Sequence, residues 1–121
     1  MLSYTYMIKS HLDIQAYQRA KKCYPLVVAL MKDVPPHGWH LRDQVCRSAN
    51  SIQAQIAEGF GRSVAEFKMY LTRALGSNNE TLSHLEDAIN IGVIDQDKAK
   101  KLIEEYTIIG KQIYNLRETW E

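Results

Sequence analysis

The sequence predicts an all-α protein folded as an antiparallel up-down-up-down four-helix bundle. Its last segment carries apolar residues at alternating spacings of three and four, the pattern of a helix with one buried seam. Glycine-rich and proline-rich stops divide the rest of the chain into three further helical segments. The connections between these segments are short, and short connections favour antiparallel neighbours.

The first helix is expected at residues 13–32. Its apolar residues keep the helical phase across Pro25, so we interpret this proline as a kink and not as the end of the helix. The residues predicted to face the core are Ile14, Tyr17, Tyr24, Val28 and Met31. The breaker Pro35-Pro36-His37-Gly38 leads to a second helix at 39–58. The core-facing residues of that helix are predicted to be Leu41, Val45, Ala49, Ile52 and Ile56.

A sharp turn follows the second helix and predicts a helical hairpin. Gly59 and Gly61 offer the left-handed backbone geometry that ends a helix. Ser63, with Glu66 three residues later, is a capping-box pattern that begins the next helix. The turn leaves Arg62 beside a helix N-terminus, where free backbone amides can bind an anion.

The third helix is expected at residues 64–91, before Gly92. Its inner stripe is predicted to be Phe67, Leu71, Ala74, Leu82, Leu85 and Ile89. Asn78 interrupts this stripe, so residues 76–80, from Gly76 to Glu80, form a polar segment that we call the waist. Arg47 and the waist lie at similar distances from the hairpin turn. We therefore predict that Arg47 pairs with Glu80 and fixes the helix register.

The fourth helix has the clearest pattern. Asp95 is expected to cap its start. Its seam is Ala99, Leu102, Tyr106, Ile109, Ile113, Leu116 and Trp120. Gly110 lies inside this helix, where a glycine is unfavourable unless another helix crosses closely. The sequence therefore predicts a close helix crossing at Gly110.

A chain of 121 residues is expected to form one domain, 1–121, with a short N-terminal arm at 1–12. Apolar side chains alternate in this arm at Leu2, Tyr4, Tyr6 and Ile8, which favours an extended conformation. The chain has no apolar run of roughly 18 residues and no signal-peptide pattern at its start. We therefore expect a cytoplasmic protein, without membrane contact, in which Cys23 and Cys46 are reduced thiols.

The sequence does not favour an enzyme. His37 and His40 are three residues apart, whereas a metal site needs three or four converging ligands. The chain lacks the Glu-x-x-His pairs of di-iron bundles, a nucleophile next to a general base, and a phosphate-binding glycine motif. We expect no catalytic residue, no metal and no cofactor.

The charges are divided unevenly along the chain. Residues 1–75 carry ten bases and five acids, whereas residues 76–121 carry five bases and nine acids. Three interpretations stay open: ordinary solvated surface, a basic patch for phosphate, or charge complementarity between subunits. The candidate partner-binding residues are Arg19, Lys22, Arg42, Arg47, Arg62 and Lys68. The candidate structural residues are Arg47, Gly59, Gly61, Ser63, Glu66, Gly76 and Glu80.

Several segments together resemble a known family. They are Asp13-Ile14-x-Ala16-Tyr17, Gln44-Val45-x-Arg47, Ser51-Ile52-x-Ala54-x-Ile56-Ala57-Glu58-Gly59-Phe60-Gly61-Arg62, and Tyr70-Leu71-x-x-Ala74-Leu75-Gly76-Ser77-x-x-Glu80. They resemble the four-helix-bundle family encoded in intervening sequences of bacterial 23S rRNA genes, from about Leu12 into the fourth helix. That family is similar, more distantly, to the accessory variability protein of diversity-generating retroelements, a pentameric bundle that works with a reverse transcriptase and nucleic acid.

The resemblance implies a non-enzymatic bundle that forms a homopentamer and has a connection to RNA or DNA. We expect an oligomeric adaptor that binds nucleic acid, or a nucleic-acid enzyme such as a reverse transcriptase, through the six partner-binding residues given above. The alternative is a protein–protein assembly module with no nucleic-acid contact. A steep salt dependence of binding would favour the first hypothesis, because phosphate contacts release counterions.

Overall fold

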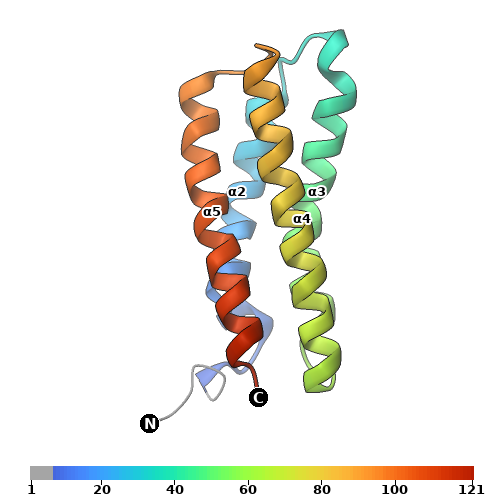
Figure 1. Cartoon of the computed structure of the whole chain (residues 1–121), viewed down its shortest axis with the longest axis vertical. Helices are drawn as coiled ribbons and strands as arrows, with labels where there is room; N and C mark the ends of the chain where they lie inside the picture. The colour runs from blue at the N-terminus through green and yellow to red at the C-terminus, as the bar shows by residue number, and fades with distance from the viewer. Residues whose placement is uncertain (1–6) are drawn as a thin grey trace.

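The computed structural model describes residues 7–121, which form an all-α bundle with its helices in up-down-up-down order (Figure 1). The long helices are α2 (Gln15–Met31), α3 (Trp39–Gly59), α4 (Val64–Asn90) and α5 (Gln96–Thr119). Two short 3-10 helices, η1 (His11–Asp13) and η2 (Pro36–Gly38), precede α2 and α3. The predicted fold class is confirmed.

Each long helix packs against two neighbours. Helix α2 contacts α3 and α5, and α4 contacts the same two helices from the opposite side of the bundle. Figure 1 shows α4 in front and α2 behind it. No helix within residues 7–121 combines the length and the apolar character that a membrane crossing requires. Of the predicted N-terminal arm, Leu2, Tyr4 and Tyr6 lie outside the described residues, and Ile8 is buried.

Helix α5 has the predicted seam. All six seam residues from Ala99 to Leu116 are buried, and Trp120 packs half-buried at the end of the helix. Asp95 caps the helix, because its carboxylate accepts a hydrogen bond from the Lys98 backbone N–H at 2.9 Å. A Cβ atom on Gly110 would lie 2.9 Å from Asn78 Nδ2 on α4. The predicted close crossing at Gly110 is therefore confirmed.

The predicted inner face of α4 is partly wrong. Leu82 and Ile89 are only half-buried, and Thr81 and Ala88 are buried in their place. The buried positions 67, 71, 74, 78, 81, 85 and 88 alternate steps of four and three, so the heptad register continues through Asn78 without a break. Asn78 and Thr81 have polar side chains, and a search for apolar residues alone therefore assigns the wrong face beyond the waist.

The predicted inner face of α2 is also partly wrong. Val28 is 43% exposed, and Tyr17 and Tyr24 are half-buried at the flank of the core. The buried residues of this helix are Ala16, Ala20, Cys23, Val27 and Met31. The three smallest of these side chains face inward, which lets the neighbouring helices approach closely. The helix continues through Pro25, as predicted.

Glycines have different roles in the turns. Gly61 and Gly92 adopt positive φ values of 88° and 72°, as expected for residues that follow a helix. Gly59 does not adopt a positive φ, because it is the last residue of α3 and has helical backbone geometry. A Cβ atom at Gly59 would lie 2.4 Å from the Tyr70 Cβ atom, so this glycine is required by the close approach of α4. The left-handed geometry predicted for Gly59 is thus wrong.

Candidate functional site

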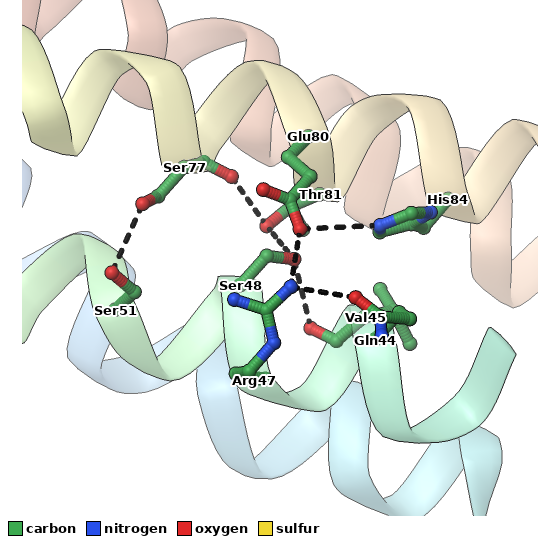
Figure 2. A network of polar contacts seen from close by, with 9 residues as sticks. All are labelled: Gln44, Val45, Arg47, Ser48, Ser51, Ser77, Glu80, Thr81 and His84. Atoms are coloured by element: carbon green, nitrogen blue, oxygen red, sulfur yellow. Dashed lines mark hydrogen bonds and ion pairs between the residues drawn. The ribbon is translucent and has the colours of Figure 1, made fainter. Parts of the chain in front are cut away.

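The waist of α4 forms the predicted ion pair with α3. Arg47 Nη2 lies 2.9 Å from Glu80 Oε2, and the same nitrogen donates to Gln44 Oε1 at 2.6 Å (Figure 2). His84 Nε2 lies 3.3 Å from the same Glu80 oxygen. The side chains of Arg47 and Glu80 are 62% and 40% exposed, so the pair is worth at most about 1 kcal/mol. The pair joins α3 to α4 at the level of the waist, and its role in setting the helix register stays a prediction.

A ladder of hydroxyl groups lies beneath this pair, between α3 and α4 (Figure 2). Ser48 Oγ and Thr81 Oγ1 are 2.8 Å apart, and Thr81 donates to the Ser77 carbonyl at 2.9 Å. Ser77 in turn donates to Ser51 Oγ at 3.0 Å. These short side chains satisfy one another and let the helices pack closely. Sequence reasoning missed Ser48 and Thr81, although Ser48-x-x-Ser51 and Ser77-x-x-x-Thr81 have the spacing of one helix face.

The other side of the waist contacts α5. Asn78 Nδ2 donates to the Tyr106 carbonyl oxygen at 2.8 Å beside Gly110. Asn78 Oδ1 and the Tyr106 hydroxyl are buried and have no hydrogen-bond partner among the described residues. Gly76 differs from Gly110, because a Cβ atom there would meet nothing within 4 Å. The packing of the described chain thus does not require the glycine that we expected to be structural at position 76.

The turn between α3 and α4 has no vacant anion site at Arg62. Ser63 Oγ accepts from the Glu66 N–H at 3.2 Å and donates to Glu66 Oε1 at 2.8 Å. The Ser63 cap is confirmed, but the Glu66 carboxylate binds the Ser63 hydroxyl and not the backbone N–H that a full capping box uses. Arg62 donates to the Glu58 carbonyl at 3.0 Å, lies 3.8 Å from Glu66 and stacks on the Tyr70 ring. The carboxylate of Glu66 therefore occupies the position that we expected an anion to take.

The other predicted arginines also have acidic partners. Arg19 on α2 lies 2.6 Å from Glu105 on α5. Arg42 lies 3.0 Å from its neighbour Asp43 and stacks on the Trp39 ring with its guanidinium carbon 5.3 Å from the ring centre. Each of these pairs reduces the positive potential that a phosphate would meet.

The predicted bases do not form a single patch. Arg19 and Lys22 lie together on α2, whereas Lys68 is half-buried on α4. The two α2 residues line a groove of about 500 Å³ between α2 and α5, together with Glu105. A second groove of about 840 Å³ continues between the same helices toward the α4–α5 turn. Its apolar lining residues are Leu26, Ala29, Leu30, Val93, Ile94 and Leu102.

The buried ionisable groups are held in their neutral forms. Burial raises the pKa of the Cys23 thiol to about 11, and the Glu105 carboxylate adds to this effect. Burial likewise raises the pKa values of Cys46 and of the Tyr106 phenol. Both thiols are therefore protonated at neutral pH, and a protonated thiol is a poor nucleophile. In the described part of the chain, no three His, Cys, Asp or Glu residues gather in a way that could hold a metal ion.

The comparisons with known proteins agree with this architecture. A family model described as 23S rRNA-intervening sequence protein matches residues 12–115. A crystal structure from Bacteroides thetaiotaomicron VPI-5482, described as a protein of unknown function from the S23 ribosomal protein family, is 26% identical. The match covers 86% of this chain and 96% of that chain, with a TM-score of 0.78. No curated protein matches this chain.

Proposed function

This chain belongs to the 23S rRNA-intervening sequence protein family, and we propose that it is a non-enzymatic adaptor that binds nucleic acid in the cytoplasm. Its ligand is RNA or DNA, presented alone or held by an enzyme such as a reverse transcriptase. The family description, which links these proteins to inserts in an rRNA, supports a nucleic-acid partner. The cysteines of the described chain, Cys23 and Cys46, are both free, which suits a reducing compartment.

The observation that carries the proposal is the charge of α2. This helix contains Arg19, Lys21 and Lys22 and no carboxylate, and both lysines are exposed. Exposed ammonium groups bind phosphates and release the counterions that surround nucleic acid. Lys22 lines the α2–α5 groove, which has a volume of about 500 Å³. We therefore assign the phosphate contacts first to Lys21 and Lys22.

A charge-removal experiment tests this assignment. Lys22→Ala should weaken binding of a labelled single-stranded RNA about threefold to tenfold and lower the salt slope by about one. Lys100→Ala removes the same charge from an exposed position on α5 and should stay within twofold of the unchanged protein. Equal effects of the two variants would show that only net charge matters. Absence of binding at 50 mM salt, to RNA and to DNA, would refute the function itself.

A second candidate function is protein–protein assembly without nucleic acid, with the chain as a homopentamer. The observation that favours it is the apolar groove between α2 and α5, beside which Leu26 is 57% exposed. Exposed apolar patches of this kind are typical of protein interfaces. Light scattering should then give five times the mass of 13.9 kDa. A monomeric mass at micromolar concentration would exclude the pentamer.

A further inference from the structure

A third groove, of about 360 Å³, lies between α4 and α5 next to the waist. Asn78 and Gly110 meet at this level, and Leu75 and Leu82 add apolar surface. The polar side chains that line it are Asn79, Thr107, Lys111, Tyr114 and Asn115. We call these five residues and the space between them the amide groove.

The amide groove differs in charge from the two grooves between α2 and α5. Both α2–α5 grooves are lined by Glu105, and the larger one is also lined by Asp33, Asp95 and Glu104. The amide groove has no carboxylate among its lining residues and contains the ammonium group of Lys111. Of the three grooves, it is therefore the one whose cation meets no acidic side chain in the groove lining.

Further positive charge lies at one end of the amide groove. Arg117 donates to the Thr72 hydroxyl on α4 at 3.3 Å, and its guanidinium carbon lies 5.2 Å from the centre of the Tyr114 ring. Glu118 lies 3.2 Å from Arg117 and offsets part of its charge. Lys68 is half-buried one helical turn before Thr72, on the same face of α4. Lys68 thus lies on this side of the bundle, away from the other predicted bases.

Tyr114 is the aromatic wall of the amide groove. Half of this residue is exposed, so its ring is not part of the core. Exposed aromatic rings beside cations are the usual stacking platforms for unpaired bases. Asn79 and Asn115 each carry an amide donor and an amide acceptor, which match the donors and acceptors on base edges. The same few residues therefore offer stacking, hydrogen bonds and phosphate contacts.

The position of Gly76 is a further argument that a ligand binds on this side of α4. It is exposed in the middle of the helix, one turn after Thr72 and nearly one turn before Asn79. Glycine is among the least favourable residues inside a helix, and nothing in the described chain occupies the space of a Cβ atom there. A glycine in such a place allows a ligand to approach the backbone closely.

We propose that the amide groove binds an unpaired nucleotide of a single-stranded nucleic acid. The base stacks on Tyr114, the amides of Asn79 and Asn115 contact its edge, and Lys111 contacts a flanking phosphate. This proposal rests on the proposed function and gives it a base-binding site. Helix α5 lies between the amide groove and the cations of α2, so one strand that crosses α5 reaches both. Base pairs inside a duplex are stacked on both faces and do not offer a free ring face to Tyr114.

The test is the binding of a fluorescently labelled 12-nucleotide oligo(U), measured by anisotropy with the full chain at 100 mM salt. Tyr114→Ala should weaken binding about tenfold, and Tyr114→Phe, which keeps the ring, should stay within twofold. Lys111→Ala should weaken binding at least threefold and lower the salt slope by about one. Lys100→Ala is the matched control. Lys100 lies roughly 16 Å from Lys111 along the axis of α5, so its removal should not change binding. Thermal unfolding of each variant checks that it is folded.

The outcomes separate this proposal from the function on which it rests. If Tyr114→Ala and Lys111→Ala bind as tightly as the unchanged protein while Lys22→Ala binds weakly, the amide groove is refuted and nucleic-acid binding stands. An equal loss in Tyr114→Phe and Tyr114→Ala would overturn the stacking role. If the unchanged protein does not bind oligo(U) or oligo(dT) at 50 mM salt, the function fails. Tyr114-dependent capture of a protein from nuclease-treated extract, without oligonucleotide binding, would make the groove a protein site and overturn the proposal.

Discussion

Gly59→Ala is the substitution whose effect the structure defines most sharply. The added Cβ atom would lie 2.4 Å from Tyr70 Cβ and 2.7 Å from Tyr70 Cγ. The α4 backbone fixes the position of the Cβ atom, so rotation of the Tyr70 side chain, which moves only Cγ and the ring, cannot remove the clash. The ring is also held between Arg62 and Arg73, whose guanidinium carbons lie 4.9 Å and 5.1 Å from its centre. Helix α4 must therefore move away from α3.

The expected cost follows from two opposing effects. Overpacking of this kind costs about 1–3 kcal/mol, and the better helix propensity of alanine returns up to about 1 kcal/mol. The free energy of unfolding should therefore fall by about 1–2 kcal/mol, which lowers Tm by about 4–8 °C in a chain of this size.

Thermal and urea unfolding, followed by circular dichroism at 222 nm, measure this effect. Gly76→Ala is the matched control, because the same substitution there meets open space within another long helix. It should raise the free energy of unfolding by about 0.5–1 kcal/mol. Because both substitutions reduce the freedom of the unfolded chain in the same way, their difference reports on the folded state. If Gly59→Ala is as stable as Gly76→Ala, the close contact between α3 and α4 at Gly59 is refuted.

Three further predictions concern stability. Glu80→Gln should lower the free energy of unfolding by no more than about 1 kcal/mol, because the Arg47–Glu80 ion pair is exposed to solvent. Urea titrations at low salt measure this change, and a loss above about 3 kcal/mol would contradict the prediction. Gly110→Ala should be less stable than Gly76→Ala by about 1–2 kcal/mol in the same titrations, because its new Cβ atom displaces the Asn78 amide from the Tyr106 carbonyl while the gain in helix propensity is the same in both. Equal stability of the two variants would contradict the crossing. Burial raises the pKa of Cys23 to about 11, so the folded state holds the thiol proton more tightly than the unfolded state. Its contribution, roughly 3 kcal/mol for a shift of about two pKa units, is complete below about pH 9 and is lost as the pH rises through 11. Cys23→Ala should show a shallower fall of stability over that range, and equal slopes would contradict burial of the thiol.

The fold could be predicted because the helix stops are local and the α5 seam is apolar throughout. Gly61 and Gly92 end helices through their own backbone geometry, and Asp95 and Ser63 begin helices through their own side chains. The inner faces of α2 and α4 were harder to predict, because tertiary packing decides them. On α4 the polar Asn78 and Thr81 occupy core positions, and on α2 small residues face inward in place of aromatic ones.

Among the candidate site residues, the Arg47–Glu80 pair could be predicted because an antiparallel hairpin brings together residues equally far from its turn. The acidic partners of the other arginines could not be predicted from the sequence. Glu105 is 86 residues from Arg19, and only the packing of α5 against α2 brings them together. The amide groove could not be predicted either, because it needs the α4–α5 crossing at Asn78. Its one signal in the sequence was Gly110 inside a long helix.

The central claim, that this bundle binds nucleic acid through exposed cations, is tested most directly by a salt titration. The dissociation constant of a labelled single-stranded RNA is measured by anisotropy between 50 and 200 mM KCl, with protein freed of co-purified nucleic acid. Three to four phosphate contacts predict a linear plot of log K against log salt with a slope of about −2 to −3, and a loss of affinity of roughly twentyfold to sixtyfold over this range. A slope near zero, or no binding at 50 mM KCl, would contradict the claim.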